Sequence, residues 1–180
     1  MEGYVKVISK SSIWGLDLLM ILITLGTQDK QFYRLLEAVE KQINEKIITD
    51  EVIVQAGYSS DFKSKKMKIF DLLPMDEFDK LMNECDVLIT HGGVGSIISG
   101  LKRNKKVIAA ARLKEYGEHT NNHQLQIIEN FSKSGYIIEL DDFNKIGEII
   151  KNIDKFIPKK YISNNEKFKK LVEKEIDKYL

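Results

Sequence analysis

The feature that most constrains the fold is a near-continuous apolar run at residues 20–25, MILITL. A strand with one face in water alternates apolar and polar residues, whereas a run of this kind is typical of a strand that is covered on both faces. We therefore expect this strand to lie inside a sheet that has helices on each side.

The rest of the chain alternates between strands and helices. Further strands are predicted at residues 51–56, 66–72, 87–90, 106–110 and 136–140. Helices are predicted where apolar residues recur at helical spacing, at residues 32–43, 78–82, 97–101, 125–131, 143–150 and 168–180. Strands that alternate with helices through short turns predict an α/β domain with a Rossmann-like parallel sheet and helices on both faces.

Residues 13–25, IWGLDLLMILITL, resemble a signal peptide because they are apolar and follow Lys6 and Lys10. Asp17 interrupts the run, however, and no small-residue cleavage site follows it. The run is also too short to span a bilayer. The favoured interpretation is a buried first strand that is preceded by an extension.

The length of 180 residues suits one domain. We predict an N-terminal extension at residues 1–19, a donor-binding Rossmann-like domain at 20–157 and a basic amphipathic helix at 158–180. The net charge of +1 gives no reason to expect nucleic acid as a partner. The single Cys85 excludes an internal disulfide and a cysteine pair for zinc.

Two glycine-containing loops follow predicted strands, namely residues 26–29, GTQD, and residues 91–96, HGGVGS. Ligands of parallel α/β sheets bind at the carboxyl ends of the strands, where both loops lie. Glycine lets the backbone approach a ligand closely, and free N–H groups at a helix start favour a phosphate or diphosphate. Ser96 is placed to cap the next helix. The alternative is that the glycines only make a tight turn between strand and helix.

The spacing of the second loop argues against two common nucleotide-binding classes. It does not match G-x-x-x-x-G-K-[ST] of kinases and ATPases, nor G-x-G-x-x-G of dinucleotide oxidoreductases. Residues 112–126, RLKEYGEHTNNHQLQ, add a polar cluster that is larger than a connector needs. Asn121 and Gln124 have the spacing of a capping box, which would explain Asn121 but not the whole cluster.

Three stretches carry a family resemblance: GTQDKQF at 26–32, ITHGGVGSI at 89–97 and EHTNNHQ at 118–124. They resemble the small bacterial capsule and exopolysaccharide glycosyltransferase subunits of the PssE or EpsF type. Those are similar to the donor-binding C-terminal domain of MurG and to the catalytic subunit of the eukaryotic two-subunit transferase that adds the second GlcNAc to dolichol diphosphate. The resemblance covers about residues 20–150, and the order of the three motifs makes it specific.

The resemblance implies one half of the two-domain GT-B architecture, which holds a UDP-sugar as donor substrate and needs no cofactor. The residues implied to meet the diphosphate are Gly93, Val94, Gly95 and Ser96. The residues implied to face the donor sugar are Asn122, His123 and Gln124, with Gln124 bonded to the sugar hydroxyls. The residues implied to line the cleft near the phosphates and the acceptor are Gly26, Thr27 and Gln28.

Three positions depart from the family pattern. Where this chain has Ser99, many relatives carry a Glu that binds the ribose hydroxyls. The sequence therefore does not predict which residue of this chain contacts the ribose. Relatives also often have Pro within and at the end of the fifth strand, where this chain has Val107 and Ala111. We expect the last two differences to change only local rigidity.

The implied reaction is displacement at an anomeric carbon with UDP as the leaving group. Fixed N–H donors at a helix start can stabilise the leaving diphosphate without a metal. The acceptor hydroxyl needs a base, for which His91 and His119 are the candidates. Alternatively, His91 braces the glycine loop or touches the leaving phosphate. His119 and His123 stand four residues apart, but HTNNH is not H-E-x-x-H, so no metal site is predicted.

The resemblance also implies a second polypeptide, because about 30 residues after the first Rossmann half are too few for another. We expect a membrane-anchored acceptor-binding subunit of the PssD type, which binds a lipid-diphosphate-linked saccharide. The chain is then expected in the cytoplasm, held peripherally at the inner face of the cell membrane through its partner. The C-terminal helix either packs on its own domain or contacts that partner or an anionic membrane surface.

The predicted function is the UDP-sugar-binding catalytic subunit of a two-chain, inverting glycosyltransferase in capsule or exopolysaccharide synthesis. Galactose, in a β-1,4 linkage, is expected by analogy with capsule relatives, and glucuronic acid and GlcNAc stay open. One alternative is a non-catalytic subunit that binds nucleotide sugar or enhances a partner transferase. Another is a nucleotide-binding module unrelated to sugars.

Overall fold

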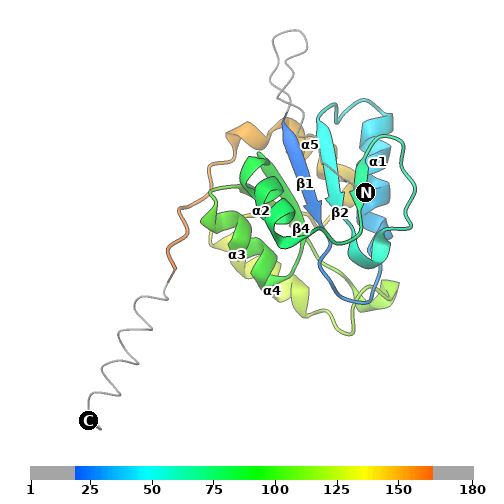
Figure 1. The fold of residues 1–180 in the computed structure, drawn as a ribbon. Coiled ribbons are helices and arrows are strands. Elements are labelled where there is room, and N and C mark those ends of the chain that lie inside the picture. The colour runs from blue at the N-terminus through cyan, green and yellow to red at the C-terminus, as the bar shows by residue number, and fades with distance from the viewer. Residues whose placement is uncertain (1–18, 164–180) are drawn as a thin grey trace.

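The structure, a computed structural model of the chain, describes residues 19–163 (Figure 1). Its centre is a parallel sheet with the order β3-β2-β1-β4-β5-β6. The strands are β1 (Met20–Thr24), β2 (Glu51–Gln55), β3 (Lys68–Phe70), β4 (Val87–His91), β5 (Lys106–Ala110) and β6 (Ile138–Glu139). This is the strand order of a doubly wound Rossmann-like sheet, so the predicted fold class is confirmed.

Helices cover both faces of the sheet (Figure 1). They are α1 (Tyr33–Asn44), α2 (Met75–Glu84), α3 (Val94–Lys102), α4 (His123–Lys133) and α5 (Ile146–Lys151). One core cluster joins the sheet to α1 and α5, and the other joins it to α2, α3 and α4. Each predicted helix within the described residues is therefore present.

Strand β1 explains why its sequence lacks alternation. It pairs with β2 on one side and β4 on the other. Ile21 and Ile23 pack toward α1 and α5, whereas Leu22 packs toward α2 and α3, and all three side chains are fully buried. An apolar residue is needed at each of these positions because both faces of the strand are covered.

The same strand marks the point where the connections change face. The chain leaves β1 for α1 on one face, and it leaves the neighbouring β4 for α3 on the other. Loops that diverge in this way leave a crevice at the carboxyl ends of the two strands. Both predicted glycine loops therefore lie at one crevice.

Several boundaries differ from the prediction. Strands β3 and β6 are shorter than the predicted ranges 66–72 and 136–140, because each lies at an edge and pairs with one neighbour. Strand β4 is one residue longer, since His91 pairs with Ala110. The predictions for residues 1–18 and for the helix at 168–180 fall outside the described residues. Between residues 19 and 163, no helix has the length and apolarity needed to cross a membrane.

Candidate functional site

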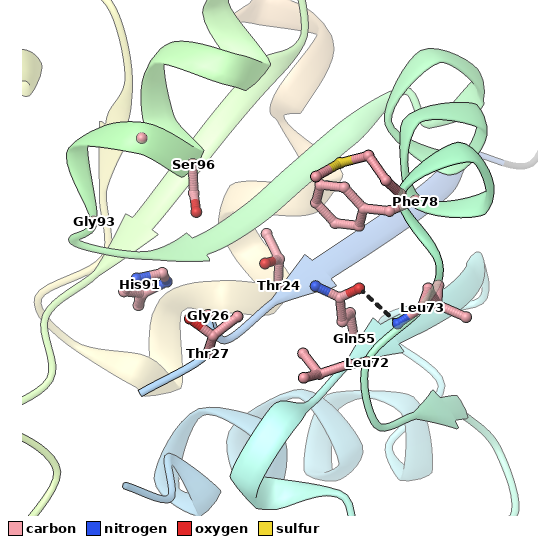
Figure 2. A pocket seen from close by; sticks show the side chains of 12 residues that line it. Thr24, Gly26, Thr27, Gln55, Leu72, Leu73, Phe78, His91, Gly93 and Ser96 are labelled. Carbon is pink, nitrogen blue, oxygen red and sulfur yellow. Dashed lines mark hydrogen bonds between the residues drawn. The ribbon is translucent and has the colours of Figure 1, made fainter. Parts of the chain in front are cut away.

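A pocket of about 490 Å³ opens at the carboxyl ends of β1, β2 and β4 (Figure 2). Six predicted site residues line it: Gly26, Thr27, His91, Gly93, Gly95 and Ser96. Six other residues complete the lining: Thr24, Gln55, Leu72, Leu73, Met75 and Phe78. The lining therefore combines a polar floor with an apolar wall, and no Asp, Glu, Lys or Arg side chain of the described residues belongs to it.

The imidazole of His91 lies between the two glycine loops (Figure 2). A Cβ at Gly26 would lie 2.7 Å from its Cε1, and a Cβ at Gly93 would lie 2.3 Å from its Nε2. Gly26 also has a φ of +76°, which favours glycine. Gly26 and Gly93 thus make room for the histidine ring. This indicates that glycine is needed at these positions to avoid a clash with His91 rather than to let a ligand approach.

Gly95 differs, because a Cβ there would meet no atom within 4 Å and would point into open space. It stands in the first turn of α3, whose initial N–H groups have no partner within the helix. The N-cap residue is Gly93, which has no side chain to cap them, so the prediction that Ser96 caps this helix is wrong. Ser96 lies inside the first turn and lines the pocket.

His91 is held neutral by its surroundings. The pKa of His91 is lowered from 6.5 to about 4. Burial is the largest cause of this decrease, and the positive charge of Arg112 contributes to it. His119, the other predicted catalytic residue, is near enough for its charge to act in the same direction. The ring also lies near a hydroxyl, with 3.4 Å between His91 Nδ1 and Thr90 Oγ1.

Gln124 joins the loop that follows β4 to the segment that follows β5. Its Oε1 accepts hydrogen bonds from the backbone N–H of Gly92 (3.1 Å) and of Arg112 (3.0 Å). The capping box with Asn121 is therefore not formed. Because Gln124 is buried and its oxygen accepts both of these bonds, its side-chain amide nitrogen is the atom that remains as a donor.

Several polar groups of residues 112–126 form hydrogen bonds with other groups of the same segment. Asn122 Oδ1 accepts from Lys114 N–H, Asn121 Oδ1 accepts from His123 N–H, and His119 Nδ1 accepts from Asn121 N–H. These bonds fix the shape of the loop and account for several of its polar residues. The pocket in Figure 2 does not include Gln28, Val94, His119, Asn122, His123 or Gln124. Their ligand-binding roles stay predictions.

Arg34 on α1 anchors this loop, and the sequence analysis missed it. Its guanidinium forms two bonds with Glu118, at 3.0 and 2.8 Å, and donates to the carbonyl of Ala111. It also lies 4.3 Å from the ring centroids of both Tyr116 and Phe143. A bidentate, stacked arginine of this kind fixes geometry well.

Gln55 is a second residue that the sequence analysis missed. It is buried at the end of β2, and its Oε1 accepts from the N–H of Leu73 (3.2 Å) in the apolar wall (Figure 2). Its signal was present in the sequence, since a polar residue ends an otherwise apolar strand. The wall residues Leu72 and Met75 gave no such signal, because nothing local indicates that they face a pocket.

Arg112 is fully buried behind these loops. Its Nη2 donates to the carbonyl of Leu25, and its guanidinium carbon lies 5.5 Å from the centroid of the Phe32 ring. Two further donors, Nε and Nη1, are buried and have no hydrogen-bond partner in the part of the chain that the structure describes. Burial lowers the pKa of Arg112, and the nearby charge of Glu118 raises it. An arginine nevertheless stays protonated at physiological pH.

No metal centre is formed by residues 19–163, in which no three His, Cys, Asp or Glu side chains gather closely enough to hold an ion. His119 and His123 do not share a helix face, contrary to what their spacing suggested, because α4 begins at His123.

A family comparison matches residues 20–179 to the glycosyltransferase family 28 C-terminal domain. A relative in Candida glabrata, UDP-N-acetylglucosamine transferase subunit ALG13, is 30% identical over 106 residues. That match covers 57% of this chain and 48% of the relative, so the chain spans about half of the relative's length.

Two solved structures share the fold. The solution structure of ALG13 has a TM-score of 0.55 and 21% identity, over 86% of this chain and 94% of that one. The calicheamicin glycosyltransferase CalG4 has a TM-score of 0.55 and 14% identity, over 76% of this chain and 34% of that one. The described domain thus corresponds to one half of a GT-B fold.

The two kinds of glycine in the second loop predict opposite effects on stability. Gly93→Ala forces the His91 ring to move, so we expect it to lower the free energy of unfolding by about 1–3 kcal/mol. Gly95→Ala meets no atom and replaces a helical glycine, so we expect stability to be unchanged or raised by up to about 1 kcal/mol. Urea unfolding measures both, and equal stabilities would contradict the assignment.

The low pKa of His91 predicts a pH dependence of stability. Above pH 6.5 the histidine is neutral in both states, but between pH 6.5 and 4 the unfolded chain binds a proton that the folded chain does not. Stability is therefore lost as the pH falls through this window. We expect the wild type to lose about 2 kcal/mol more than His91→Gln between pH 7 and 5. A His91 NMR signal that titrates near pH 6.5 would contradict this.

Proposed function

Because the chain belongs to the glycosyltransferase family 28 C-terminal domains, we propose that it binds a UDP-sugar and acts as the donor-binding part of a glycosyltransferase. The observation that carries this is the open position of Gly95, where the first turn of α3 meets the pocket at the carboxyl ends of β1 and β4. Backbone N–H groups of such a turn bind diphosphate well.

The rest of the lining suits the other parts of the ligand. Leu72, Leu73 and Phe78 offer a nucleoside an apolar wall, and Gln55 adds a buried amide beside it. The donor sugar lies beyond the diphosphate, toward His119 and the start of α4. There it meets the side chains of Asn122, His123 and Gln124, which the family resemblance assigns to it.

The chemistry we propose is inverting displacement of UDP by an acceptor hydroxyl. The N–H groups of α3 stabilise the negative charge that grows on the leaving diphosphate. A histidine with a pKa of about 4 is a weak base at neutral pH, so His91 serves better by bracing the loops and bonding to the leaving phosphate in its neutral form. His119, or a group of a second polypeptide, then takes the proton that the hydroxyl of the acceptor substrate loses.

We further propose that the active enzyme contains two chains. The name of the Candida glabrata relative, a transferase subunit, supports this. The proposed partner is a membrane-anchored PssD-type subunit that holds a lipid-diphosphate-linked acceptor at the inner face of the membrane. Capsule or exopolysaccharide synthesis is the proposed setting. The family resemblance favours galactose as the transferred sugar, whereas the name of the relative favours GlcNAc.

Calorimetric titration with UDP, UDP-galactose, UDP-GlcNAc and UDP-glucuronic acid tests the donor site. We expect Gly95→Val to weaken UDP binding at least tenfold, because its side chain occupies the space that the diphosphate needs. Gly95→Ala should lose less UDP affinity, since a single methyl group occupies less of the space that the diphosphate needs. The unfolding free energy of each variant serves as the control. UDP affinity that is independent of the residue at 95 would remove the support for this site.

A transfer assay with the chain alone, the candidate partner alone and both together tests the two-chain proposal. We expect sugar transfer only from the mixture, because neither chain then holds both substrates. Full activity of the partner alone would establish the alternative of a non-catalytic subunit. Full activity of this chain alone would disprove the need for a partner.

A further inference from the structure

The pocket presents a charge problem. A nucleoside diphosphate carries at least two negative charges, yet no ionic side chain from residues 19–163 lines the pocket. The N–H groups of α3 supply partial charges only. Within residues 19–163, Arg112 is a cation whose charge reaches the pocket lining, because it acts on His91.

Arg112 lies in the interior, where a charge without a partner destabilises the fold. Its side chain has no exposed surface, and within residues 19–163 its guanidinium makes one hydrogen bond, from Nη2 to the carbonyl of Leu25 just after β1. Leu25 directly precedes the glycine loop that borders the pocket. A buried cation is destabilising unless it is paired and its donors are satisfied.

Among residues 19–163, the carboxylate whose charge acts on Arg112 is that of Glu118, and it is already engaged. Glu118 binds Arg34 through both oxygens, and its Oε2 also accepts from the N–H of Leu113 (3.0 Å). Two cations thus share one buried carboxylate, which leaves this part of the interior with a charge of +1. Arg34 is partly exposed and can be screened by water, whereas Arg112 cannot.

We infer that Arg112 is a buried counter-charge for an anionic ligand, acting through its field on the pocket that Gly26, His91 and Gly93 line. This rests on the proposed function, since the ligand is the diphosphate of a sugar nucleotide. The unpaired charge is then compensated when the ligand binds. In a low-dielectric interior a charge acts over a longer range than in water, so direct contact is not needed.

The groups that face Arg112 are consistent with this role. Leu25 contributes a carbonyl dipole, Phe32 a ring face, Glu118 a carboxylate that is shared with Arg34, and His91 a neutral ring. His119 adds a titratable group that also acts on His91. A purely structural arginine would be expected to satisfy more of its five donors.

The test compares UDP with uridine, which lacks the phosphates, on the wild type and on Arg112→Met and Arg112→Lys. We expect Arg112→Met to bind UDP about tenfold more weakly and uridine with unchanged affinity, because only the charged part of the ligand senses the arginine. Arg112→Lys keeps the charge and should retain most of the UDP affinity. In Arg112→Met the NMR titration of His91 should also move toward 6.5, because the charge of Arg112 no longer acts on the pocket lining.

Methionine is chosen because replacing a poorly paired buried charge by an apolar side chain is often neutral or stabilising. If that variant does not fold, Arg34→Met replaces it. Loss of Arg34 frees Glu118 to neutralise Arg112, and the same selective loss of UDP affinity is expected.

The outcomes separate the two proposals. A wild type that fails to bind UDP overturns the proposed function itself. A wild type that binds UDP, with Arg112→Met binding it equally well, overturns the counter-charge alone. An equal loss of UDP and uridine affinity also overturns it, since it assigns Arg112 to pocket shape. A selective loss of UDP affinity supports it.

Discussion

The structure depends on one constraint, the complete burial of β1. Its side chains are covered on both faces and its backbone is paired with β2 and β4, so this position satisfies both its apolar residues and its N–H and C=O groups. From this central position the chain leaves β1 and β4 toward opposite faces. The crevice between their loops, which holds the candidate site, is a consequence of that divergence.

Within the crevice, one histidine organises the backbone. The His91 ring fills the space that Gly26 and Gly93 leave free, and its neutral state allows it to be buried there without a partner charge. The proposed diphosphate site lies at the next turn, where Gly95 is open. Behind the ring, Arg34, Glu118 and Arg112 form a charged layer that fixes the polar loop and leaves one positive charge uncompensated.

The sequence predicted more of the fold than of the candidate site. The parallel sheet, the helices within the described residues and the two glycine loops were predicted, because hydrophobic spacing and glycine clusters are local signals. Six of the twelve predicted site residues line the pocket. Four of the others lie in residues 112–126, which look like a ligand-binding loop, but Asn122 and Gln124 accept hydrogen bonds from backbone groups of the same segment. The wall at Leu72 and Met75 was missed because exposed apolar residues carry no local mark of a pocket.

The sequence by itself determined the α/β architecture and the family, since periodicity and three ordered motifs are properties of the chain alone. Only the tertiary structure decided what the glycines do. Whether a missing Cβ makes room for a ligand or for a neighbouring side chain depends on which atoms stand opposite it, and His91 stands opposite two of the three glycines discussed. The same holds for the unpaired charge of Arg112, because a charge is buried or compensated only through residues that are distant in sequence, such as Leu25, Phe32 and Arg34.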